Sequence, residues 1–218
     1  MEREPFQFYT RFNLSELTGL KASTAGELLA LLREVPGACM YHHTHRFLQQ
    51  HLFVSPEPPN DFAYWVREAL GEDELAEQLA SVNIIDYPTI RAVRERFIFL
   101  LEDYLGRNPA ARERACRGGE EFQVIKSVSF IVPTGIFART LAEFTAALAA
   151  VSLPVIYFHM FEARLRLEKG NNDFSNWLAD SLGQTEAAEK IARIDPYTFT
   201  LDGLRAAILQ IIQKTTAR

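Results

Sequence analysis

Residues 6–27 read FQFYTRFNLSELTGLKASTAGE, and residues 122–143 read FQVIKSVSFIVPTGIFARTLAE. The two stretches align without a gap: Phe-Gln, Thr-Gly and the alanine, threonine and glutamate that follow fall at the same places. In the later stretch every second residue from Phe122 to Val132 shares one face that is mostly apolar, which predicts a strand. The Pro-Thr-Gly run at 133–135 is then expected to end that strand in a short turn, because proline and glycine are typical of turns.

A helix is predicted directly after this turn in both stretches. Thr24 and Thr140 are suitable N-caps, and each is followed three residues later by a glutamate, which is the spacing of a capping box. Apolar residues then recur at helical intervals as far as Pro36 and Pro154, where we expect the helix to end.

The correspondence continues well beyond these stretches. Without a gap, Tyr41 falls on Tyr157 and His43 on His159; after a loop that is four residues shorter in the second half, NDFAYW from Asn60 falls on NDFSNW from Asn172. We interpret the chain as a tandem duplication, with repeat 1 at 6–105, a linker at 106–121 and repeat 2 at 122–216.

The predicted fold is mostly α, of the α+β class. Each repeat is expected to contain one short strand and about five helical pieces, and a pseudo-twofold axis would relate the two. Neither half has many residues with which to close a core, so the strands are expected to pair across the axis; whether the repeats share one core stays open. The segments around Tyr41 and Tyr157 fit either a buried strand or a buried helix, and we favour the helix. In WVREALGEDELAEQLASV, from Trp65, Gly71 is expected to divide the helical run into two short helices.

The composition of the chain restricts the classes of function that we expect. The 218 residues are 48% hydrophobic and 23% charged, as in globular proteins, and the formal net charge is −5. An acidic chain without a long basic run argues against nucleic-acid binding. We find no apolar run long enough for a transmembrane helix, and MEREPFQF lacks the apolar core of a signal peptide. With two scattered cysteines, we expect reduced thiols and a cytoplasmic protein.

The repeated histidines are the first candidate site. His43 and His159 could be paired metal ligands or an acid–base couple, because imidazole titrates near neutral pH. The alternative is that each histidine is buried and holds a backbone carbonyl or the aspartate of the NDF motif. We favour this structural alternative.

Further candidates lie around these histidines. His42 and His45 could bind one metal on a helix, but phenylalanines replace them at 158 and 161, so we favour a partly exposed polar face. The aspartates of the NDF motifs, Asp61 and Asp173, could orient a histidine or bind a ligand, but N-capping explains them equally well, and we favour capping. The candidate ligand-binding residues are Tyr41, His43, Asp61, Trp65, Tyr157, His159, Asp173 and Trp177.

No nucleotide-binding, nucleophile-elbow, paired-cysteine or kinase motif is present in the sequence. The order FQ…TG, YxH, NDF..W and LG…AE resembles an uncharacterised prokaryotic family of unknown function, once in each half. This resemblance implies a prokaryotic protein and transfers no catalytic residue.

The leading hypothesis is a non-catalytic module that binds a small molecule or a protein, in the groove between the repeats, with no cofactor that the sequence identifies. The alternatives are a metal-binding protein or acid–base enzyme that uses His43 and His159, and a structural homodimer subunit with an exposed apolar patch. Homo-oligomers are compatible with each of these hypotheses.

Overall fold

The computed structural model describes residues 4–46, 60–163 and 171–216. Helices make up 60% of the described residues, beside a two-stranded antiparallel sheet, so the expectation of a mostly helical α+β protein is confirmed. The helix expected at the two YxH segments is also confirmed, since a short α-helix and a π-helical turn follow one another there.

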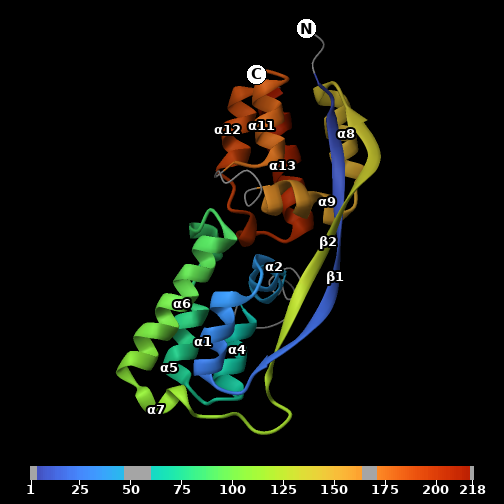
Figure 1. The fold of residues 1–218 in the computed structure, drawn as a ribbon. Coiled ribbons are helices and arrows are strands. Elements are labelled where there is room, and N and C mark those ends of the chain that lie inside the picture. Colours follow the sequence, from blue (N-terminus) through green and yellow to red (C-terminus); the bar gives the residue numbers. More distant parts are fainter. Residues whose placement is uncertain (1–3, 47–59, 164–170, 217–218) are drawn as a thin grey trace. The chain divides into compact units, whose positions relative to one another are not determined.

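The strands are longer than predicted. Strands β1 (Phe6–Ala22) and β2 (Phe122–Ala138) each contain 17 residues and run side by side in Figure 1. The prediction that Pro-Thr-Gly ends the second strand is wrong, because β2 continues through it. A two-stranded sheet has only edge strands, which is where proline is tolerated.

The Thr-Gly pairs lie within the strands. Gly19 and Gly135 both have φ +78°, a conformation that favours glycine and marks an irregularity within a strand. The threonine before each glycine donates its hydroxyl to a carbonyl of the opposite strand: Thr18 to Val124 at 2.7 Å, and Thr134 to Phe8 at 2.8 Å. These side-chain bonds join the strands beside the irregularity.

The chain divides into two compact units that exchange strand segments. Unit 1 comprises residues 1–12 and 129–218, and unit 2 comprises residues 13–128. The first segment of β1 therefore belongs with the helices of the second half of the sequence, and the first segment of β2 belongs with those of the first half.

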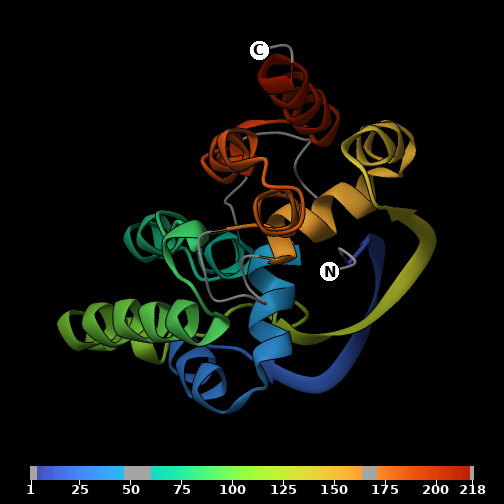
Figure 2. The same cartoon turned by 90° about the horizontal axis from the view of Figure 1, so that it is seen from above.

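Unit 2 contains the helices of the first half, and α1, α4, α5 and α6 lie together in Figures 1 and 2. Its elements are α1 (Ala25–Glu34), α2 (Gly37–Tyr41), the π-helical turn η1 (His42–Arg46), α4 (Asp61–Glu68), α5 (Asp73–Ala80), the 3₁₀ turn η2 (Ile84–Asp86), α6 (Ile90–Arg107) and α7 (Pro109–Arg112). At its centre the ring of Phe122 packs on Phe62 and Trp65, with centroid separations of 5.3 and 5.6 Å.

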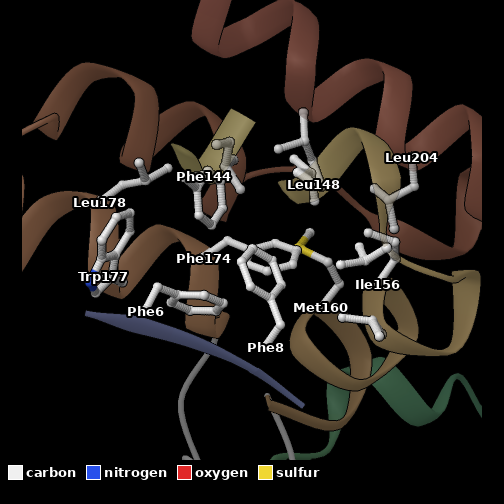
Figure 3. Packing of buried hydrophobic residues seen from close by; sticks show 14 of the residues in the cluster. Phe6, Phe8, Phe144, Leu148, Ile156, Met160, Phe174, Trp177, Leu178 and Leu204 are labelled. Carbon is white, nitrogen blue, oxygen red and sulfur yellow. The ribbon is translucent and has the colours of Figure 1, made fainter. Parts of the chain in front are cut away.

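Unit 1 repeats this order of elements as far as α6, and its described residues include no counterpart of α7. Its elements are α8 (Leu141–Ala150), α9 (Leu153–Tyr157), the π-helical turn η3 (Phe158–Glu162), α11 (Asp173–Asp180), α12 (Thr185–Ala192), the 3₁₀ turn η4 (Pro196–Thr198) and α13 (Leu201–Thr216). Figure 3 shows Phe6 and Phe8 of β1 pointing into a cluster with Phe144, Phe174 and Trp177. The strand segment thus completes the core of these helices.

The predicted helix caps are present. Thr24 and Thr140 accept hydrogen bonds from the backbone of Glu27 and Glu143, and the second pair forms a full capping box. Between α4 and α5, Gly71 has φ +66° at the break that was predicted there. Local sequence signals therefore place the helix boundaries well.

Candidate functional site

Each repeated histidine joins an aspartate to a strand. In unit 2, Nδ1 of His43 lies 2.6 Å from Oδ2 of Asp61, and Nε2 accepts the backbone N–H of Ile125 at 2.9 Å. In unit 1, Nδ1 of His159 lies 2.7 Å from Asp173, and Nε2 accepts the N–H of Tyr9 at 2.9 Å. Both histidines are 2% exposed. We call each of these arrangements a histidine clamp.

The clamp defines the tautomer of its histidine. A backbone N–H only donates, so the Nε2 atom that it faces must carry a lone pair. The proton of the neutral ring therefore lies on Nδ1 and is donated to the aspartate. Both ring nitrogens are engaged, and neither can bind a metal while these bonds persist.

The asparagine and the aspartate of each NDF motif have different roles. Asn60 and Asn172 are the N-caps, and their side chains accept the backbone N–H groups of Ala63 and Ser175. The aspartates that follow are thereby placed in the first helical turn, where each accepts a hydrogen bond from the Nδ1–H group of its histidine. The capping role that was favoured for the aspartates is wrong, because the preceding asparagines are the caps. The aspartates are bonded to the histidines instead, which is the orienting role.

Metal binding by the histidines receives little support from this geometry. Within the described residues, His42, His43 and Asp61 have ligand atoms within 4.8 Å of one another. The ring of His43 is nevertheless occupied on both sides by the clamp. His43 and His159 belong to different units, so their predicted action as a pair stays an untested hypothesis.

A groove opens in unit 1 beside the histidine clamp. Its volume is about 650 Å³, which falls in the range of small-molecule sites. Its walls include His159, Asp173 and Trp177, three of the predicted site residues. The other lining residues are Glu4, Pro5, Phe6, Gln7, Tyr9, Ile131, Phe158, Asn176, Asp180 and Ser181.

The described lining of this groove is acidic and aromatic. Glu4, Asp173 and Asp180 contribute carboxylates, and no lysine or arginine is among the described lining residues. The indole Nε1 of Trp177 donates to the carbonyl of Glu4 at 3.0 Å, which holds the start of the chain against the wall of the groove. The described part of the groove is thus suited to a ligand with positive charge.

Comparison with known proteins identifies the family. A family described as being of unknown function, DUF5752, matches residues 3–213. The chain belongs to this family. It is also similar to the solved structure of OrfY from Thermoproteus tenax, with 31% identity, a TM-score of 0.80 and coverage of 100% of this chain and 99% of that one. No curated protein matches it.

The match to DUF5752 confirms the predicted resemblance to a family of unknown function. It extends over both halves of the sequence at once, and therefore does not test whether the halves are copies. No helix in the described part of this DUF5752 protein is long and apolar enough to cross a membrane.

The predicted aromatic candidates are mostly buried. Tyr41 stacks on His45, and Tyr157 stacks on Phe161, at 5.6 and 4.6 Å between ring centroids. Trp65, 7% exposed, donates its indole N–H to the carbonyl of Glu120, as Trp177 does to Glu4. Of these four rings, only Trp177 lines the groove.

The prediction that His42 and His45 lie on a partly exposed face is wrong, because both side chains are buried. They are 8% and 3% exposed. The pKa of each is lowered to about 4, by burial at both and, at His42, also by the neighbouring His43 and Arg46. Both side chains are therefore neutral near pH 7.

An exposed apolar segment of the strands was missed. In unit 1, Phe12, Phe130 and Phe137 are 60%, 52% and 48% exposed, and Ile131, Val132 and Ile136 are also exposed. The alternation that includes Phe130 and Val132 predicts a strand with one mostly apolar face, but sequence alone does not show how far the helices cover that face. Glu4 and Asp180 of the groove were also missed, although acidic residues at 120 and 68 mark the same positions in the other half.

Proposed function

We propose that this protein is a non-catalytic binding module whose unit 1 holds a small organic cation in the groove. The main observation behind the proposal is the groove, in which three carboxylates and several aromatic rings line a volume of about 650 Å³. Ammonium and guanidinium groups are attracted both to carboxylates and to aromatic faces. With this proposal we retain the expectation of a cytoplasmic, prokaryotic protein made of two tandem copies about a pseudo-twofold axis.

The two histidine clamps support the duplication. Tyr9 and Ile125 occupy equivalent positions in the two halves, as do the histidines that receive their N–H groups. The clamps also support a binding role rather than acid–base catalysis. Each imidazole is bonded to a strand and an aspartate, and the bonds of His159 order the wall of the groove.

Isothermal titration with benzylamine and spermidine tests the proposal, with benzyl alcohol as the uncharged control. We expect saturable binding of the amines and none of the alcohol. Asp180→Asn should weaken amine binding by a factor of up to about five, since a partly exposed ion pair contributes about 0.2–1 kcal/mol. Glu68→Gln, which changes the corresponding last residue of α4 in unit 2, should have no effect. Equal binding of alcohol and amine would refute the proposal.

A second candidate function is assembly with another copy of the chain through the exposed strand segment of unit 1. Six large apolar side chains are exposed there on a sheet whose outer edges have no further strand among the described residues. Open strand edges pair readily with identical edges, and a two-stranded sheet gains stability from added strands. This observation favours the homodimer alternative more than it favours a monomer.

A further inference from the structure

The buried side-chain atoms of unit 2 that have no hydrogen-bond partner include His42 Nδ1, Arg46 Nε and Ser127 Oγ. His42 and Ser127 are only 8% and 6% exposed. An unsatisfied buried donor costs about 1–3 kcal/mol, so such groups usually have a function or a missing partner. The described residues also contain no carboxylate that forms an ion pair with Arg46.

Unit 1 shows what fills the same place. The residues equivalent to Arg46 and Ser127 are Glu162 and Arg11. There, Nε of Arg11 lies 2.8 Å from Oε2 of Glu162 in an ion pair whose carboxylate is 2% exposed. The guanidinium also lies 5.9 Å from the ring centre of Phe158, the equivalent of His42. Unit 1 therefore pairs a cation with an anion at this place.

The histidine clamps show that these positions correspond. Arg11 follows Tyr9 by two residues, as Ser127 follows Ile125, and both Tyr9 and Ile125 donate to a clamp histidine. Glu162 and Arg46 each come three residues after that histidine, at the end of a π-helical turn. Arg46 is also close enough to His42 to act on it electrostatically. Unit 2 thus keeps a guanidinium at this place without its carboxylate.

We propose that unit 2 binds a small oxyanion, a carboxylate or a phosphate, between Arg46, Ser127 and His42. A guanidinium presents a fork of N–H donors that matches two oxygens of such a group. The serine hydroxyl and the neutral imidazole of His42 each provide a further donor. The anion would pair with the guanidinium of Arg46 as the Glu162 carboxylate pairs with that of Arg11 in unit 1. This site is independent of the groove and of the function proposed for it.

Thermal unfolding with inorganic phosphate or acetate, at constant ionic strength maintained with sodium chloride, tests this site. We expect a saturable rise in the Tm of the wild-type chain with at least one of the two anions, and the anion that acts distinguishes phosphate from carboxylate. The double variant Arg46→Glu/Ser127→Arg installs the ion pair of unit 1, with each charge at the position equivalent to the one that it has there. It should match or exceed the wild-type Tm without added anion and lose the response.

If the double variant does not fold, Ser127→Ala provides the second test of the anion site. Loss of one donor should raise the anion concentration needed for half of the effect at least threefold, while Ser129→Ala, two residues further along β2, should leave it unchanged. No saturable response in the wild-type chain, or an unchanged response in Ser127→Ala, would overturn the proposal.

Discussion

The imidazole of His159 accepts a hydrogen bond from the backbone N–H of Tyr9, 150 residues earlier in the chain. The same relationship joins His43 to Ile125 across 82 residues. Each bond fastens the first segment of a strand to helices from the other half of the sequence. The histidines that drew attention as chemical groups are thus central to the strand exchange.

Replacing His159 should loosen the start of β1. His159→Ala leaves the N–H of Tyr9 and the carboxylate of Asp173 without their bonds, and should lower the free energy of unfolding by about 2–4 kcal/mol. The conservative change Asp173→Asn retains an acceptor for Nδ1 and should cost less than about 1 kcal/mol. Urea unfolding and amide exchange at Tyr9 measure these effects. A change below about 0.5 kcal/mol for His159→Ala would show that the clamp is not structural.

The buried histidines of unit 2 should make stability depend on pH. The pKa of His42 and His45 is about 4 in the folded chain, below the ordinary value of 6.5. Between these values the unfolded chain binds the additional protons, so stability falls as the pH is lowered from 6.5 to 4. His45→Phe introduces the residue that unit 1 has at the equivalent position, Phe161. It should reduce the loss of stability between pH 6.5 and pH 4 by on the order of 2 kcal/mol.

Urea unfolding at pH 7 and at pH 4.5 checks this effect. We expect His45→Phe to fold, because the hydroxyl of the neighbouring Thr44 still donates to the carbonyl of Met40 when His45 is replaced. A variant whose stability depends on pH as steeply as that of the wild type would contradict the assignment of this loss to His45.

The glycines within the strands should resist replacement. Gly135→Ala forces a side chain into φ +78°, although no atom within 4 Å obstructs the added carbon. We therefore expect a cost of about 1 kcal/mol that arises from backbone conformation alone. Gly106→Ala in α6 meets the same open space without positive φ and should be neutral or stabilising. Equal effects of the two changes in thermal unfolding would rule out the backbone explanation.

The apolar strand segment should control self-association. Phe130→Thr/Phe137→Thr keeps residues that suit a strand while it removes two exposed rings. Light scattering after size exclusion should show dimers of the wild-type chain and monomers of the variant. Phe99→Ala removes a ring that is 56% exposed on α6 and should leave the dimer intact. A wild-type chain that is monomeric at high concentration would exclude this assembly.

Local signals in the sequence predicted the helices because caps and periodicity act over a few residues. Thr140 with Glu143, and Gly71 between two helices, are examples. The strand exchange was not predictable in this way, since it depends on contacts such as that of Phe6 with Trp177, which no short window contains. Asp61 shows a similar limit: its neighbour Asn60 caps the helix, and only the packed structure reveals that Asp61 is bound to His43.

Mapping amide chemical shifts during titration with benzylamine tests the central claim most directly, because it locates the ligand. We predict saturable changes concentrated at residues 4–9 and 176–181, which line the groove, and their loss in Asn176→Tyr, which copies Tyr64 of unit 2 and fills the groove. Changes that are absent, that spread over both units, or that benzyl alcohol reproduces would contradict a cation site in unit 1.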